Sequence, residues 1–143
     1  MVPISFTLRV ASRDYSTEAF TAWSTDKLHG LLHFDGDTVT IEWTGTASID
    51  EVSGLDVQSR TVAVPPMTLN IPLSSLRTAK LAGGWWRPRV ELTGNDVQIL
   101  SQIPGESGGR VQLWITRRDR SRAATLVGSL HRVARRLQEG VQR

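Results

Sequence analysis

The stretch LHGLLHFDGDTVTIEWTG, residues 28–45, decides the fold class. Its centre is the run Asp-Gly-Asp at 35–37, and an Asp-Gly pair supplies the positive φ angles that a tight hairpin needs. After this run Val39, Ile41 and Trp43 alternate with polar residues, which is typical of a strand with one buried face. The stretch therefore predicts an antiparallel hairpin with strands at about 28–34 and 38–43.

Between Leu28 and Arg117 turn signals recur at short intervals, which is typical of an all-β chain. Alternating apolar residues predict further strands near 67–81, at 87–93 and at 110–116, with weaker alternation at Val97, Ile99 and Ile103. The intervening residues 44–66 are rich in Gly, Ser and Asp and end in two prolines. We expect them to form a long connection in which any strand is short or lies at an edge.

After the last strand the apolar spacing changes to three and four residues, which predicts an α-helix. Asp119 is placed to cap its N-terminus, and Gly140 is placed to end it. We expect the sheet to be faced by Leu126, Leu130, Val133 and Leu137.

The first 27 residues carry more apolar surface than a solvated tail. Phe6, Leu8 and Val10 alternate, so we expect residues 4–11 to add a strand to an open edge of the sheet, in the same chain or in a neighbouring one. Residues 17–24, with Phe20 and Trp23, could form a turn or two of helix.

Composition bounds the class of protein. The 143 residues suit one domain, and the absence of cysteine excludes disulfides, thiolate metal sites and cysteine nucleophiles. No apolar run reaches the roughly 20 residues of a membrane span, and the N-terminus lacks the features of a signal peptide. We therefore expect a cytoplasmic protein.

Charge is unevenly distributed along the chain. The net charge is +3, but residues 1–76 carry −5 and residues 77–143 carry +8, mostly as arginine. Such asymmetry can mark an anionic partner. Alternatively, the two halves lie next to each other in the fold and neutralise each other.

The order of about seven strands followed by one amphipathic helix resembles the pleckstrin-homology-like fold, in particular its bacterial and GRAM-type members. The resemblance rests on residues 30–34 leading into 38–42, on Ile71-Pro72-Leu73, and on 111–115 running into the helix. It implies a mainly β chain: a bent sheet or barrel of about seven antiparallel strands with a C-terminal capping α-helix. The chain would then divide into an N-terminal extension (1–27), the domain (28–138) and a tail (139–143).

Members of that superfamily bind phosphoinositides, peptides or other proteins, and the resemblance implies no catalysis. Lipid-binding members carry basic residues around the first hairpin. Here that hairpin carries Asp35, Asp37 and Glu42, with no Arg or Lys between His29 and Trp43, which argues against phosphoinositide recognition there.

The sequence predicts no catalytic, metal or cofactor site. On a strand, His29 and His33 lie about 13 Å apart, too far for one ion. Ser107, in PGESGG, has Glu106 beside it but lacks the strand–nucleophile–helix context of a hydrolase. We therefore expect a protein that is not an enzyme.

Two clusters are candidate binding sites. A tryptophan beside arginines is typical of a partner-binding hot spot, although both rings could instead cover the rim of the barrel or pack under the N-terminal segment. This first cluster is Trp85, Trp86, Arg87 and Arg89. The second, a possible anion site or a solvated helix entry, is Arg117, Arg118, Arg120 and Arg122.

We accordingly predict a module for protein–protein interaction or self-association, with a homodimer possible. The alternative is binding of an anionic ligand, nucleic acid or a membrane surface, through the second cluster. No nucleic-acid motif accompanies these arginines, which argues against nucleic acid.

Overall fold

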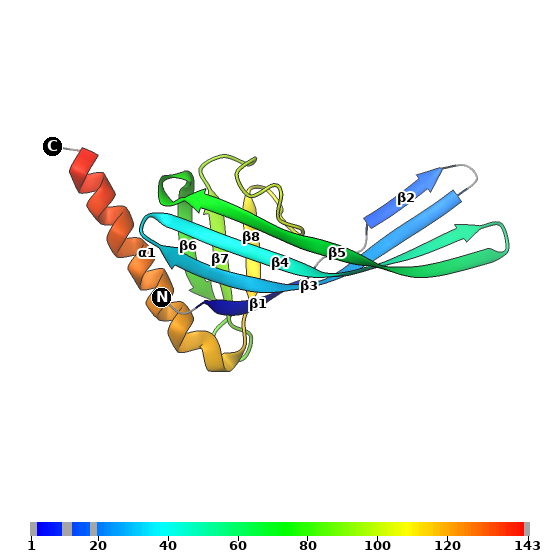
Figure 1. Ribbon diagram of the computed structural model, residues 1–143, viewed down its shortest axis with the longest axis horizontal. Coiled ribbons are helices and arrows are strands. Elements are labelled where there is room, and N and C mark those ends of the chain that lie inside the picture. Colours follow the sequence, from blue (N-terminus) through cyan, green and yellow to red (C-terminus); the bar gives the residue numbers. More distant parts are fainter. Residues whose placement is uncertain (1–2, 10–12, 18–19, 142–143) are drawn as a thin grey trace.

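The computed structural model describes the backbone of residues 3–9, 13–17 and 20–141, and the side chains of residues 3–8 and 27–140. Val10, the side chains of Phe20 and Trp23, and residues 142 and 143 of the predicted tail lie outside the described residues. Within the described residues the elements are strands, two 3-10 helices (η) and one α-helix (Figure 1): β1 (Ile4–Arg9), β2 (Arg13–Thr17), β3 (Phe20–Asp35), β4 (Thr38–Ser53), β5 (Asp56–Pro72), η1 (Leu73–Ser75), β6 (Leu76–Ala82), β7 (Arg89–Gly94), β8 (Arg110–Trp114), η2 (Arg117–Asp119) and α1 (Arg120–Val141).

The strands form one antiparallel sheet in the order β5-β4-β3-β1-β8-β7-β6, and β2 pairs with β3 outside this path. Helix α1 packs on the sheet against β6, η1 and β3. The predicted fold class, mainly β with about seven antiparallel strands and a C-terminal helix, is confirmed.

The hairpin of residues 28–45 is also confirmed. Asp35 pairs with Thr38 across a tight turn, and Gly36 has the positive φ of 64° that such a turn requires. Val39, Ile41 and Trp43 point inward and are at most 3% exposed. Burial of one face therefore produces the alternation seen in the sequence.

Strand β1 is present, but not where we expected it. It pairs with β3 along its whole length and meets β8 at the Thr7–Trp114 pair, so it lies inside the sheet rather than at an edge. The side chains of Ile4, Phe6 and Leu8 point into the core and are buried. The N-terminal strand therefore joins the two halves of the sheet.

The first half of β3 also differs from the sequence-based expectation. The backbone of residues 20–24 is extended rather than helical. The predicted domain start at residue 28 consequently falls inside a continuous strand.

Further along β3, Gly30 lies opposite Phe6, and a Cβ on Gly30 would stand 1.8 Å from the backbone oxygen of Glu42. Only glycine fits here, because the backbone of Glu42 on β4 and the ring of Phe6 on β1 both lie too close for a Cβ atom.

The predicted long connection at 44–66 is wrong. Strand β4 continues to Ser53, turns at Gly54, and returns as the 17-residue β5. The expectation of an edge holds for β5, the outermost strand on its side of the sheet, but not for residues 44–53 of β4, which lie between β3 and β5. The register shifts between Trp43 and Gly45, opposite Pro65 and Pro66, because prolines cannot continue a regular ladder.

These long strands divide the molecule into two regions, which we call the arm and the body. The arm consists of β2 and of residues 20–26, 46–53 and 56–63 of β3, β4 and β5, and the body is the rest. The arm projects from the body on the side away from α1 (Figure 1). Every buried side chain described belongs to the body.

Helix α1 covers the body with part of its length. Leu126 and Leu130 are buried as predicted, and Val133 packs partly against the core. The prediction for Leu137 is wrong, because its side chain is 41% exposed. Gly140 does not end the helix, which runs on to Val141.

The segment between β7 and β8 forms turns rather than a strand. Leu100 and Ile103 from this segment are buried, and Ile99 packs partly against the core. Val97 is exposed. The apolar residues of this segment are therefore spaced for a compact loop that packs against the core, not for a strand.

Candidate functional site

The two predicted clusters meet at the turn between β6 and β7. The chain turns at Gly83 and Gly84, which have φ angles of +84° and +63°. Residues 85–87 therefore lie in a turn, and the predicted start of a strand at Arg87 is wrong by two residues. Trp85 and Trp86 are both exposed, by 61% and 73%, so neither ring covers the rim of the sheet.

Arg117 of η2 lies over Trp86. The guanidinium carbon of Arg117 is 4.5 Å from the centre of the Trp86 ring, which is a cation–π contact. Arg120 supports the same turn, because its Nε donates a hydrogen bond of 3.4 Å to the backbone oxygen of Gly84. Two arginines of the second predicted cluster, Arg117 and Arg120, therefore contact Trp86 of the first cluster and the turn that carries it.

The remaining arginines differ in their surroundings. Arg87 and Arg118 are exposed, whereas Arg122 lies 3.7 Å from Asp119 in an ion pair. Among the described side chains, each ion pair joins residues from the same half of the chain: Arg60–Glu51, Lys80–Glu91, Arg89–Glu91 and Arg122–Asp119. No described ion pair links the acidic half to the basic half.

Arg89, on the outer face of β7, forms an ion pair with the buried carboxylate of Glu91. Its Nε lies 2.9 Å from Oε1 of Glu91, which also accepts a hydrogen bond from Gln112, while Lys80 lies 3.4 Å from the other oxygen of Glu91. Burial raises the pKa of Glu91, but hydrogen bonds from Arg89 and Lys80 and their positive charges outweigh it, so the pKa lies below its usual value. Glu91 is therefore a carboxylate at neutral pH.

Arg89 also lies over Trp114 of β8, with its guanidinium carbon 5.3 Å from the ring centre. Sequence reasoning missed both Glu91 and Trp114. Glu91 alternates with the buried Val90 and Leu92, a pattern that predicts an exposed carboxylate. It is buried because Arg89 of its own strand, Lys80 of β6 and Gln112 of β8 bind it.

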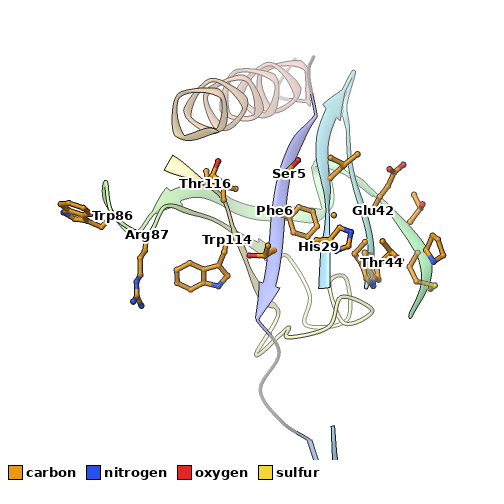
Figure 2. A pocket seen from close by; sticks show the side chains of 17 residues that line it. Ser5, Phe6, His29, Glu42, Thr44, Trp86, Arg87, Trp114 and Thr116 are labelled. Atoms are coloured by element: carbon orange, nitrogen blue, oxygen red, sulfur yellow. The ribbon is translucent and has the colours of Figure 1, made fainter. Parts of the chain in front are cut away.

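A groove of about 740 Å³ crosses the outer face of the sheet between this turn and β5 (Figure 2). Trp86 and Arg87 form one end, Trp114 and β1 form the middle, and Glu42 and Thr44 line the other side. The groove spans β8, β1, β3, β4 and β5, about 19 Å at the usual strand spacing.

The lining of the groove is mainly apolar, with a few polar groups. Trp86, Trp114 and Leu31 supply large apolar surfaces, and Leu31 is 39% exposed although it belongs to a strand of the body. Polar side chains surround them, notably Ser5, Thr7, His29, Glu42 and Thr44. Such a mixture can bury apolar side chains of a ligand while its polar atoms find hydrogen-bond partners.

A second, smaller pocket of about 190 Å³ is lined by Trp114, Gln112 and the loop that contains Ser107. The backbone of Ser107 exchanges two hydrogen bonds with Arg110, which makes this loop a tight turn. His29 and His33 sit on the same strand, and among the described residues no three His, Asp or Glu side chains gather as a metal site requires.

In comparisons with known proteins, no family model, no curated protein and no solved structure matches this chain. Among the described residues, no helix has both the length and the apolar character needed to cross a membrane.

Proposed function

We propose that this chain is a non-enzymatic interaction module of the pleckstrin-homology-like type, and that its groove binds a segment of a partner protein. The fold supports the pleckstrin-homology-like type, because four strands (β1, β3, β4 and β5) and three strands (β6, β7 and β8) surround one core that a C-terminal helix covers. The bacterial and GRAM-type members of this fold, which the sequence resembles, have the same order of strands followed by one helix.

The observation that carries the proposal is the position of Trp86. Its ring is 73% exposed at the end of an apolar groove, yet Arg117 holds it from one side. An exposed tryptophan that is fixed in place loses little conformational entropy on binding, and tryptophan and arginine are enriched at binding hot spots. Trp114, held by Arg89, extends the same surface into the groove.

The neighbouring Trp85 provides a matched control. It is 61% exposed, but it does not line the groove. A Trp86→Ala variant and a Trp85→Ala variant therefore lose the same side chain and differ only in whether the groove is changed.

The test uses the wild-type chain and both variants as baits in an extract of the native host. We expect a protein retained by the wild type and by Trp85→Ala, with binding to Trp86→Ala weakened at least about tenfold, as for a hot-spot residue. A partner retained equally by all three baits would contradict the groove as the binding site.

A second candidate function is anion binding beside Trp86. Arg87 and Arg118 are exposed near the stacked Arg117, so several positive charges stand at one end of the groove. Binding through phosphates must weaken steeply between about 50 and 200 mM salt. Filter binding with oligonucleotides and sedimentation with anionic vesicles test this, and no retention at low salt would remove the candidate.

A further inference from the structure

The two strands at the ends of the order β5-β4-β3-β1-β8-β7-β6 have differently protected edges. At one edge, α1 packs against β6, and Nε2 of His131 lies 2.7 Å from the backbone oxygen of Ala79. At the other edge, the body part of β5 carries Pro65, Pro66 and Pro72, which prevent regular pairing. The edge from residue 56 to residue 64, which comprises the arm part of β5 and the adjacent Val64, has neither protection.

Residues 56–64, DVQSRTVAV, have the composition of a pairing strand. They contain β-branched residues and no proline or lysine, and Val57 and Val62 are 65% and 43% exposed. Among the described residues, no strand pairs with the outer side of this segment. A long exposed edge of this kind is a template for another strand.

We propose that this edge pairs with the same edge of a second copy of the chain, antiparallel and about a two-fold axis. In such a pairing one residue faces its own counterpart, and residues at equal distances on either side face each other. The choice of the central residue therefore fixes every pair.

Charge selects the register. With Arg60 at the axis, two arginines would face each other, which is unfavourable. With Gln58 at the axis, Asp56 of each copy faces Arg60 of the second copy, so two opposite-charge pairs form. We assign the register with Gln58 at the axis.

The contacts within one chain agree with this register. Arg60 lies 3.4 Å from Glu51 on β4, so pairing places its guanidinium between Glu51 of its own chain and Asp56 of the second copy. Leu55, at the turn of the arm, is fully exposed and would face Thr61 of the second copy. The interface uses only the arm, so this proposal does not rest on the groove, whose lining belongs to the body.

The test is a charge exchange across the axis. In the Asp56→Arg variant, arginine faces arginine in each of the two pairs, and in the Arg60→Asp variant, aspartate faces aspartate. We therefore expect the dissociation constant of each variant's dimer to be at least about tenfold higher than that of the wild type. An equal mixture of the two variants restores both opposite-charge pairs. We expect the mixture to form a heterodimer.

The measurement is the average molar mass, by light scattering or sedimentation, at total concentrations from about 1 to about 100 μM. In this range the average molar mass of a dimer with a micromolar dissociation constant falls on dilution. Asp35→Arg and Arg118→Asp make the same charge changes at exposed positions of the body and should leave the mass unchanged. Circular dichroism checks that all variants fold. A monomeric wild type at every concentration, a dimer that both variants leave intact, or a mixture that stays monomeric would each overturn the proposal.

Discussion

The body and the arm share three long strands, β3, β4 and β5, but the side chains of these strands have different surroundings in the two regions. In the body, the inward residues of β4 are nearly inaccessible to solvent, whereas no residue of β4 within the arm is buried. The ladders between β3, β4 and β5 nevertheless continue from one region into the other. Backbone pairing can therefore extend a sheet well beyond the core that stabilises it.

This difference predicts which region contributes most of the free energy of unfolding and which surfaces remain available for association with another chain. Among the described side chains, apolar burial, the main stabilising contribution, is confined to the body, so substitutions at the described positions of the arm should cost little. The exposed edge of the arm is free for association. The following experiments compare the two regions, starting with the largest expected effect.

Removal of a whole segment should separate the regions most clearly. A chain without residues 1–9 loses β1 and its three buried side chains, and we expect it not to fold cooperatively. An armless chain replaces residues 10–26 and 46–63 with Asn-Gly turns, which join Arg9 to Lys27 and Gly45 to Val64. Those residues already face each other in the ladders.

We expect the armless chain to melt cooperatively, because it keeps every side chain that the structure places in the core. Thermal melts followed by circular dichroism check both variants. If the armless chain were unfolded while the chain without residues 1–9 folded, the division into body and arm would be wrong.

Two isoleucines on β4 compare the regions at one residue each. Ile41 is fully buried in the body, and Ile49, eight residues further along the same strand, is half-buried in the arm. We expect Ile41→Ala to lower the free energy of unfolding by about 2–5 kcal/mol, because it leaves a cavity, and Ile49→Ala to lower it by less than about 1 kcal/mol. Urea denaturation measures both, and equal losses would show that the arm has a core of its own.

Helix α1 offers the same contrast between a packed and a projecting part. Leu130 is 1% exposed, whereas Leu137 is 41% exposed. Leu130→Ala should cost about 2–5 kcal/mol and Leu137→Ala about 0.5 kcal/mol or less. A loss below about 0.5 kcal/mol for Leu130→Ala in denaturant melts would mean that the helix does not pack on the sheet.

The smallest expected effect concerns the buried charge on the outer face of the body. Because the pKa of Glu91 is lowered in the folded chain, its contribution to stability is present above the unfolded-state pKa, about 4.3, and is lost as the pH falls through the lower folded-state pKa. We expect Glu91→Gln to be less stable than the wild type by about 1–3 kcal/mol at pH 7. This difference should shrink in denaturant melts below about pH 4, and a difference independent of pH would contradict the assignment.

Sequence reasoning succeeded where burial leaves a periodic pattern. Val39, Ile41 and Trp43 alternate because one side of β4 faces the core, and Leu126 and Leu130 follow the helical period for the same reason. The arm parts of β4 and β5, whose side chains the structure describes, have no buried face, so their residues show no period of two. Ser48 and Asp50 of the arm, and Gly45 just before it, were consequently interpreted as a connection although all three lie within β4.

The candidate site was predicted only as separate pieces. The tryptophan and arginine residues were identified by their composition, but Trp86 and Arg117 are 31 positions apart, and no local pattern shows that they meet. The contact arises because β7 and β8 bring the turn at Gly84 beside η2, where Arg120 also reaches it. The groove could not be predicted at all, since its lining depends on β1 lying inside the sheet.

The most direct test of the groove uses the side-chain N–H signals of the tryptophans, of which the chain has five. Proton–nitrogen correlation spectra would be recorded before and after addition of the protein partner recovered with the wild-type bait. We predict that the signals of Trp86 and Trp114, which line the groove, shift on binding, while that of Trp85 stays in place. A shift of Trp85 with Trp86 and Trp114 unchanged would contradict binding in the groove.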